Sequence, residues 1–189
     1  MIIQPEFNLD KVWENTWESL SKGIATQGHP FKTPVFISFR KNYPIGRVVV
    51  LRDLDNDKQF WFYTDSRSEK VKYLERMPVG NFVFYDSASM VQIRIMAKIS
   101  IHKEDEVAKQ LWEAIPDNQR ADYGGDFAPG VTLQGPEEQT HDGKMGYYFC
   151  ALCCSPFEME VLQLRPGEGH LKVRYEKSTT GWTQQWIAP

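Results

Sequence analysis

Short strand-like segments separated by turn-forming residues constrain the fold of this chain more than any other feature. In each segment β-branched and aromatic residues dominate, as they do in strands that bury at least one face. Gly, Pro, Asp and Asn collect between the segments, where turns are expected. This many short strands in 189 residues predicts a mainly antiparallel β domain that closes into a barrel or a split barrel. The expected strands are residues 34–39, 46–52, 59–64, 81–85, 90–101, 147–153, 158–164, 170–176 and 182–187.

Two segments have apolar residues at helical spacing instead of alternation. The first predicts a helix over residues 10–23, within an N-terminal segment of residues 1–25. The second follows the strand at residues 59–64. There Ser66 and Glu69 form a capping-box pattern, and Pro78 ends the expected helix.

The remaining part of the chain predicts one more helix and one long loop. The helix is expected over residues 104–115, and residues 116–146 are rich in Pro, Gly and Asp. Long loops in compact domains are often functional. With 41% hydrophobic residues the chain can bury one sizeable core, so we expect a single domain over residues 1–189.

The charge balance excludes some classes of partner. With 22 basic and 25 acidic residues the net charge is −3, whereas a general nucleic-acid binder would carry a basic excess. No apolar run approaches the roughly 18 residues that a membrane span needs. The first residues lack a basic segment followed by an apolar stretch. We therefore expect a cytoplasmic protein that binds neither nucleic acid nor membrane.

The cysteines and histidines predict no metal site. Cys150, Cys153 and Cys154 are an odd trio within five residues, which is no disulfide framework and only a weak metal motif. In an apolar strand they are better interpreted as small core residues. The four histidines show no ligand spacing.

Cations and hydroxyls cluster in sequence around the second predicted helix. Ser66, Arg67, Ser68 and Lys70 surround its expected start, where free backbone N–H groups favour anions. Arg47 and Arg52 bracket an earlier strand, but their odd separation places them on opposite faces of a regular strand. A phosphate site and a solvated turn with surface charges both fit this pattern.

A series of short motifs keeps a recognisable order along the chain. They are Arg47 to Arg52, Phe62-Tyr63-Thr64, Ser68-Glu69-Lys70, Pro78, Gln92-Ile93-Arg94, Met159 to Gln163, Gly167-Glu168, Arg174-Tyr175, Trp182 and Ala188-Pro189. In this order they resemble pyridoxamine 5′-phosphate oxidases over residues 30–102 and 147–189. The resemblance implies an FMN-binding split barrel with short flanking helices. It also implies a homodimer with flavin at the interface, in which residues 147–189 complete the barrel and the dimer.

The resemblance also implies roles for individual residues. Arg47, Arg52, Ser68 and Lys70 look like contacts to the FMN phosphate and ribityl chain, and Arg67 is expected to replace a charge that is absent at Glu69. The flavin ring is expected to contact the backbone of Val48, Val49 and Val50, the pair Tyr63 and Thr64, the side chain of Gln92, and Arg174 from the second subunit.

The substrate side departs from the family pattern. The positions of its Arg-x-His pair hold His170 and Lys172, and the helix that contacts the substrate phosphate shows Gln110 and Ala114. We therefore expect an FMN-dependent oxidoreductase whose small-molecule substrate is undefined, with His170 and Lys172 on the substrate side. Two alternatives remain open: a non-catalytic flavin-binding or sensing protein on the same fold, and a related barrel that holds haem.

Overall fold

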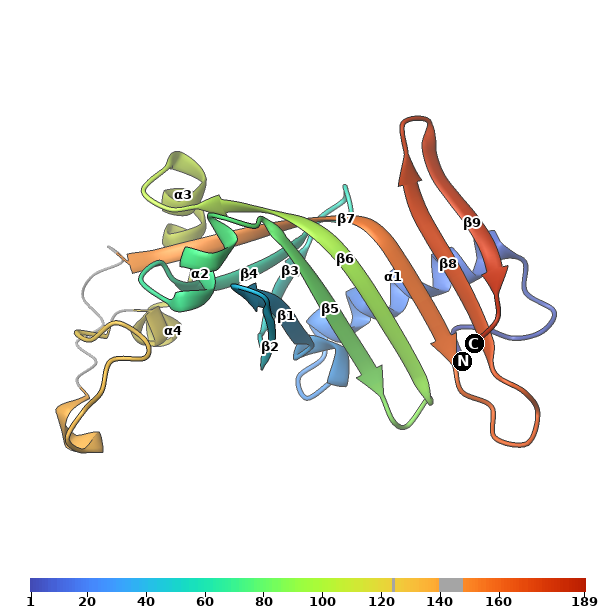
Figure 1. The fold of residues 1–189 in the computed structure, drawn as a ribbon, viewed down its shortest axis with the longest axis horizontal. Helices are drawn as coiled ribbons and strands as arrows, with labels where there is room; N and C mark the ends of the chain where they lie inside the picture. Colours follow the sequence, from blue (N-terminus) through green and yellow to red (C-terminus); the bar gives the residue numbers. More distant parts are fainter. Residues whose placement is uncertain (124, 140–147) are drawn as a thin grey trace.

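A computed structural model describes residues 1–123, 125–139 and 148–189 of the chain. Nine strands and several helices make up this part (Figure 1). The strands are β1 (Val35–Arg40), β2 (Tyr43–Val48), β3 (Leu51–Leu54), β4 (Phe60–Asp65), β5 (Val79–Asp86), β6 (Val91–His102), β7 (Phe149–Gln163), β8 (Leu171–Ser178) and β9 (Gly181–Ile187). The α-helices are α1 (Leu9–Ala25), α2 (Glu69–Leu74), α3 (Glu106–Ala114) and α4 (Asp117–Arg120), and the 3-10 helices are η1 (Pro30–Lys32), η2 (Ala121–Tyr123) and η3 (Pro136–Glu138).

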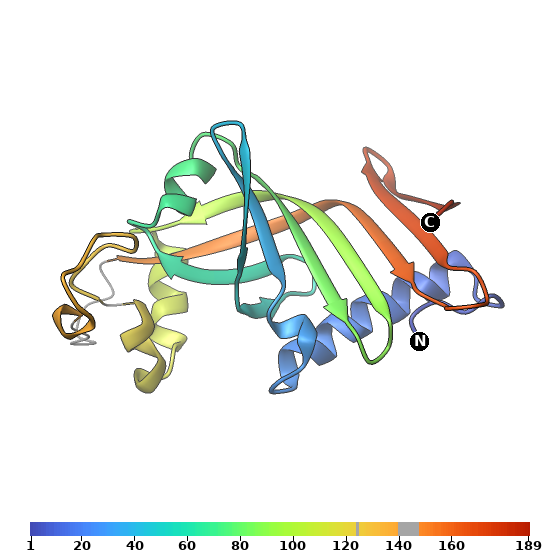
Figure 2. The same ribbon diagram turned by 60° about the horizontal axis from the view of Figure 1, so that its bottom comes forward.

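All strand pairs are antiparallel, and the order β2-β1-β5-β6-β7-β4-β3 forms the main path of one sheet. The two ends of this path, β2 and β3, are separated in the chain by only Val49 and Val50. A sheet whose end strands are joined by two residues must curl until its edges meet. The predicted barrel-like architecture is therefore confirmed (Figure 2).

Strand β7 changes its second neighbour halfway along its length. Its first residues, Phe149–Cys154, pair with β4, whereas Glu158–Gln163 pair with β8. Strand β6 pairs with both halves, and a register shift after Met96 marks the change. The hairpin of β8 and β9 thus extends the sheet away from the barrel, at the end of the molecule opposite to α2 and α3 (Figures 1 and 2).

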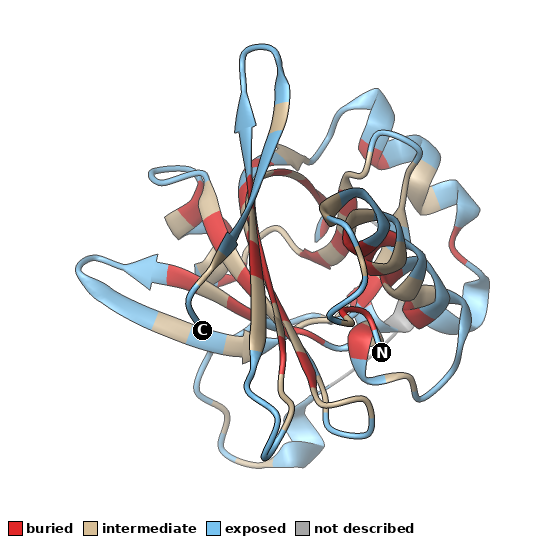
Figure 3. Ribbon diagram, turned by 90° about the vertical axis from the view of Figure 1, so that its right-hand side faces the viewer, coloured by how far each residue is buried: buried red, intermediate tan, exposed pale blue. Residues whose placement is uncertain are grey.

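Aromatic side chains from different strands fill the barrel. Phe82 stacks on Phe36 and Phe62, with ring centroids 4.8 and 4.9 Å apart. Helix α1 packs its apolar stripe, including Trp17, against this core. The buried residues accordingly follow the inner faces of the strands, whereas the hairpin tips are exposed (Figure 3).

A smaller apolar cluster lies on the other side of β4 and β7. Helix α3 contributes Ala108 and Leu111, and β7 contributes Phe149. Because neighbouring strand residues point to opposite faces, β4 serves both clusters: Phe62 enters the barrel, and Tyr63 packs against Phe149.

Several element boundaries differ from the sequence-based expectation. The strand expected over residues 46–52 is interrupted, because the chain must pass from one edge of the sheet to the other at Val49 and Val50. The strands expected at 147–153 and 158–164 form the single strand β7, and Tyr147 lies outside the described residues. The N-cap of α2 is Ser68, so the capping box of Ser66 and Glu69 was wrong.

Two further expectations have clear outcomes. Cys150, Cys153 and Cys154 are buried in β7, which confirms them as core residues. Burial raises the pKa of the Cys150 thiol to about 12 and that of Cys153 to about 11. Helix α1 has 17 residues, so this flanking helix is longer than predicted. In the described part of the chain no helix is long and apolar enough to cross a membrane.

Candidate functional site

Four of the predicted site residues meet at the junction of β2, β4 and α2. The Lys70 Nζ donates hydrogen bonds to Thr64 Oγ1 at 2.5 Å and to Ser68 Oγ at 3.3 Å. The Arg47 Nη1 donates to Ser38 Oγ at 2.8 Å, and Ser38 is buried on β1. We call Ser38, Arg47, Thr64, Ser68 and Lys70 the Arg47–Lys70 cluster.

The two cations of the Arg47–Lys70 cluster have only distant anionic compensation among the described residues, from Glu69 at Arg47 and from Asp65 at Lys70. Burial, and then the positive charge of Arg47, hold the pKa of Lys70 below its usual range. Burial likewise lowers the pKa of Arg47. Within residues 1–123, 125–139 and 148–189 neither cation forms an ion pair with a carboxylate. Partly buried cations surrounded by hydroxyls fit a phosphate, because the phosphate would relieve their mutual repulsion.

The local backbone explains why side chains dominate this cluster. Helix α2 is only six residues long, so its dipole is small. The side chain of Ser68 makes no cap hydrogen bond to the helix and accepts from Lys70 instead. The attraction for an anion therefore comes from Arg47 and Lys70 more than from the helix start.

Arg52 and Tyr63 belong to a separate cluster beside α3 and α4. The Arg52 Nη2 donates to the Tyr123 hydroxyl at 2.6 Å, and the Tyr63 and Tyr123 rings lie 6.3 Å apart. These residues line a cavity of about 230 Å³ together with Gln119. Arg52 Nε is buried and has no hydrogen-bond partner within the described residues. The structure thus places Arg47 and Arg52 in different environments, because they lie on different strands, β2 and β3, on the two sides of the interruption at Val49 and Val50.

Arg67 is occupied by protein groups. Its Nη2 lies 2.7 Å from Asp65 Oδ2 and also donates to the Gly125 carbonyl at 2.7 Å. Its guanidinium stacks over the Tyr148 ring, with 3.5 Å between its carbon and the ring centroid. The hydrogen bond from Arg67 to Asp65 raises the pKa of Arg67. In this structure Arg67 therefore fastens the segment after Tyr123 to the barrel.

The three predicted valines lie where β2 ends and β3 has not begun. Val48 is 66% exposed and Val50 is 38% exposed. The Val49 N–H donates to the Pro34 carbonyl at 3.1 Å. The exposed valine side chains make this link an open apolar surface.

Gln92, Lys172 and Arg174 lie on the outward face of β6, β7 and β8. Gln92 alternates with the buried Val91 and Ile93, so its side chain points away from the core. Gln92 and Lys172 are both cross-strand neighbours of Leu162. Strand β8, which carries Lys172 and Arg174, lies at the end of the molecule opposite to α2 (Figure 1).

His170 does not join this group. It is exposed just before β8, and its Nδ1 lies 3.0 Å from the backbone nitrogen of Arg165. This places it in the turn between β7 and β8. Lys172 instead forms an ion pair with Glu160 at 3.1 Å.

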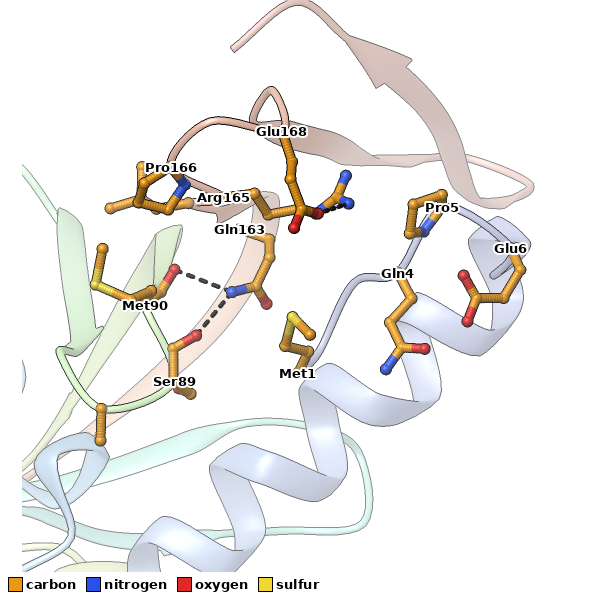
Figure 4. Close-up of a pocket in the computed structure, with 12 residues that line it drawn as sticks. Met1, Gln4, Pro5, Glu6, Ser89, Met90, Gln163, Arg165, Pro166 and Glu168 are labelled. Carbon is orange, nitrogen blue, oxygen red and sulfur yellow. Dashed lines mark hydrogen bonds and ion pairs between the residues drawn. The ribbon is translucent and has the colours of Figure 1, made fainter.

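Another cavity lies elsewhere, between the N-terminal segment and the turns after β5 and β7 (Figure 4). It measures about 630 Å³ and is mainly apolar. Gln163 at its base donates to the carbonyls of Ser89 and Met90 at 2.7 and 3.1 Å. Arg165 on its rim is paired with Glu168. The residues that line it include none of the predicted site residues, and Gln163 and Arg165 already have partners within the protein.

Three contributors were missed by the sequence analysis. Ser38 is a polar residue within the otherwise apolar run of residues 35–39, a signal that was available but weak. Tyr123 lies in a segment expected to be a loop, and its contact with Arg52 carried no sequence signal. Glu160 belongs to a recognised motif, but its ion pairs depend on the register of three strands.

The chain is similar in sequence to proteins of one FMN-binding family. Residues 11–103 match the family model described as pyridoxamine 5′-phosphate oxidase, FMN-binding domain. A pyridoxine/pyridoxamine 5′-phosphate oxidase of Salinibacter ruber is 26% identical over 159 residues, covering 77% of this chain and 74% of that protein. The protein of the same name from Legionella pneumophila is 27% identical over 163 residues, with 79% and 74% covered.

Two solved structures share the fold over nearly the whole chain. The first is a pyridoxamine 5′-phosphate oxidase-related, FMN-binding protein from Nostoc punctiforme, with a TM-score of 0.78, 19% identity and 100% of both chains covered. The second is PhzG from Burkholderia lata in complex with tetrahydrophenazine-1-carboxylic acid, with a TM-score of 0.75, 17% identity, and 98% and 95% covered. The domain that matches is the FMN-binding domain of its family, so FMN is the cofactor of this fold. This chain is a divergent member of the pyridoxamine 5′-phosphate oxidase-like family of FMN-binding split barrels.

Proposed function

We propose that this protein is an FMN-dependent oxidoreductase that acts on a small-molecule substrate as a homodimer. The observation that carries the proposal is the Arg47–Lys70 cluster, in which two partly buried cations face three hydroxyls without a carboxylate partner among the described residues. A dianionic phosphate matches that charge and that set of donors.

The proposed phosphate contacts come from this cluster. Lys70 and Arg47 donate to the phosphate, while Ser68 and Thr64, which now accept from Lys70, are free to donate their hydroxyl protons. Ser38 keeps Arg47 in place through its hydrogen bond. Arg67 takes no part in this grip, because Asp65 and backbone carbonyls occupy it.

The proposed contacts to the flavin ring require a second copy of the chain. Arg47 is paired with Phe36 in register and shares its core-facing side, whereas Gln92 points outward. Arg174 lies on β8, far from α2 (Figure 1). One flavin can therefore reach all these groups only if Gln92 and Arg174 come from the partner. Exposed Val35, Val48 and Tyr85 on the outward face supply apolar surface for such a dimer.

Bound FMN would supply two-electron redox chemistry by accepting a hydride from the substrate. The protein then has to bind and orient the substrate and exclude water. The cavity beside Arg52, Tyr63 and Tyr123 is proposed for an anionic group of the substrate, because Arg52 has a buried nitrogen without a partner among the described residues. Lys172 is proposed on the substrate side of the partner's flavin, and His170 at its margin.

The alternative is a flavin-binding or sensing protein without turnover. It is favoured by one observation: Lys172, expected on the substrate side, forms an ion pair with the buried carboxylate of Glu160. Such a protein would hold FMN by the same contacts but would not reduce it with any substrate.

One experiment separates these functions. The cofactor is released from protein purified from cells and identified by its absorption spectrum and mass, which also distinguishes flavin from haem. The same sample is then assayed for oxidation of pyridoxamine 5′-phosphate and pyridoxine 5′-phosphate, with oxygen consumption as readout. We expect FMN in the purified protein. An empty or haem-loaded protein would contradict the proposal, and FMN without reduction by any tested substrate would favour the sensing protein.

A further inference from the structure

A buried carboxylate organises the cations on the outward face of the sheet. Glu160 on β7 is directly opposite Arg94 on β6 and Arg174 on β8, so the three side chains form one row across three strands. Glu160 is only 4% exposed, whereas the side chains of Arg94 and Arg174 are more than a third exposed. We call Glu160 with Arg94, Lys172 and Arg174 the Glu160 cluster.

Both oxygens of Glu160 are used fully. Oε1 accepts from Arg174 Nε at 3.0 Å and from Arg174 Nη2 at 2.8 Å. Oε2 lies 2.9 Å from Arg94 Nη2 and 3.1 Å from Lys172 Nζ. Burial raises the pKa of Glu160, but hydrogen bonds from Arg174 and Lys172 and the charge of Arg94 outweigh it and leave the pKa below its usual value. Glu160 is therefore ionised at neutral pH.

The cluster carries more cations than its carboxylates neutralise. Arg94, Lys172 and Arg174 face Glu160 and, at 3.5 Å from Arg94, Glu158. Glu176, opposite Glu158 on β8, also acts on Arg174 through its charge, so the excess of cations is confined to the Glu160 cluster itself, on the face that also presents Gln92. Surface arginines normally sample many rotamers. The two-point hydrogen bond of Arg174 to Glu160 fixes its guanidinium in one orientation instead.

Stability alone is a poor reason for such a cluster. Buried ion pairs are often replaceable by apolar residues without loss of stability, since desolvation offsets their attraction. Lasting orientation of a charged group is the property that an apolar replacement cannot supply.

We propose that Glu160 is a positioning residue that holds Arg174 in the orientation needed to contact the flavin bound at the partner's Arg47–Lys70 cluster, and holds Lys172 on the substrate side of that flavin. This inference rests on the proposed function, because it assumes an FMN-binding homodimer. Glu160 touches neither flavin nor substrate and acts only through the cations that it binds.

The test is a double-mutant cycle with Glu160→Gln and Arg174→Gln, singly and together, in the full-length protein. The readouts are the FMN dissociation constant from flavin fluorescence and the flavin midpoint potential. Glu158→Gln is the matched control, because it removes a carboxylate from the same face of the same strand; among the described residues this carboxylate forms its ion pair with Arg94 and acts on Arg174 only through its charge. Glu160→Asp keeps the charge but shortens its reach, and it replaces Glu160→Gln if that variant folds poorly.

The sign of the potential shift separates positioning from a simple charge effect. If Arg174 stays in place, loss of the Glu160 charge makes the site more positive, which favours reduced anionic flavin and raises the potential. If Arg174 is released, the potential falls. We expect it to fall in Glu160→Gln and Glu160→Asp, FMN to bind less than tenfold more weakly in both, and Glu158→Gln to match the wild type.

We also expect non-additivity, because a residue that acts through Arg174 has little left to do once Arg174 is changed. Additive effects, a raised potential in Glu160→Gln, or wild-type behaviour of all Glu160 variants would overturn the proposal while leaving FMN binding intact. A wild-type protein that binds no FMN would instead overturn the proposed function, and this inference with it.

Discussion

The protein carries two cationic clusters that solve opposite electrostatic problems. In the Arg47–Lys70 cluster two partly buried cations donate to hydroxyls and form no ion pair among the described residues, and Glu69 and Asp65 act on them only through more distant charge. In the Glu160 cluster three cations saturate one buried carboxylate. Burying the two cations of the Arg47–Lys70 cluster costs free energy until an anion binds, whereas Glu160 already has its ion-pair partners within the described chain. The difference teaches that an unpaired cation marks a place for a ligand charge, whereas a paired cation marks a place where orientation is fixed.

The largest expected effect comes from emptying the first cluster. Arg47→Ala combined with Lys70→Ala should weaken FMN binding by roughly 10²–10⁴-fold, because two charged hydrogen bonds contribute about 1.5–3 kcal/mol each. Fluorescence titration of the apoprotein with FMN measures the change. Inorganic phosphate should also raise the melting temperature of the wild type but not of the double variant.

The matched control removes two exposed cations from the neighbouring elements, Arg40→Ala on β1 with Lys72→Ala on α2. Its FMN affinity should stay within about threefold of the wild type, since screened surface charges contribute little. Equal losses in the two double variants would mean that net charge, not the Arg47–Lys70 cluster, holds the phosphate.

Mutation of the Glu160 cluster should lower the free energy of unfolding, whereas mutation of the Arg47–Lys70 cluster should lower the affinity for FMN. Glu160→Ala leaves three cations facing one another across β6, β7 and β8, which should lower the free energy of unfolding by about 3 kcal/mol. This lies at the low end for a broken buried pair because the cations reach solvent. Urea unfolding of the apoprotein measures it. A loss below about 1 kcal/mol would show that the cluster is not built around Glu160.

The two clusters also differ in how far the sequence predicts them. Thr64, Ser68 and Lys70 are close in the chain, so local motifs bring them together and the sequence finds them. Arg94, Glu160 and Arg174 come from three distant strands, and only the register of β6, β7 and β8 makes them neighbours. Long-range register leaves no local signal.

The fold shows the same limit. The β-branched and aromatic residues of β1, β4 and β6 predicted these strands closely, because such residues favour a strand with at least one buried face. The interruption at Val49 and Val50 went unpredicted, since their β propensity favours a continuous strand. Closure of the barrel, a property of the whole sheet, overrides that propensity.

A change in the barrel core should have an intermediate effect and tests whether core packing keeps Arg47 of the Arg47–Lys70 cluster in place. A Cβ on Gly80 would lie 2.2 Å from Phe36 Cε2, and the guanidinium of Arg47 lies over the same ring at 5.7 Å. Gly80→Ala should therefore cost about 1–3 kcal/mol of stability by overpacking and also weaken FMN binding.

Gly46→Ala is the control, because its Cβ would meet Val35 Cγ1 at an ordinary 3.5 Å. Thermal unfolding and FMN titration of both variants give the result. If the Gly80→Ala protein is destabilised but keeps its FMN affinity, Phe36 does not position Arg47 for FMN binding.

The smallest effect is a pH dependence in two separate ranges. Both lowered pKa values make stability rise with pH, but for Lys70 the rise relieves a cost in the alkaline range, whereas for Glu160 it adds stability in the acid range. The pKa of Lys70 is lowered in the folded protein by burial and by Arg47, from an ordinary value of 10.5. Between the lowered value and 10.5 the unfolded chain binds more protons, so the apoprotein should gain stability as the pH rises through this range. The pKa of Glu160 is also lowered, from 4.5, but for a carboxylate this adds stability above 4.5 that is lost as the pH falls through the lowered value.

Difference measurements isolate each contribution from the other titrating groups. Subtracting the unfolding free energy of Lys70→Met from that of the wild type should give a difference that rises toward alkaline pH, with Lys72→Met as a flat control on the same helix. Subtracting that of Glu160→Gln should give a difference that shrinks only in acid. If the contribution of Lys70 to stability falls at alkaline pH, an anionic group already pairs with Lys70. The contrast between the Arg47–Lys70 cluster and the Glu160 cluster would then fail.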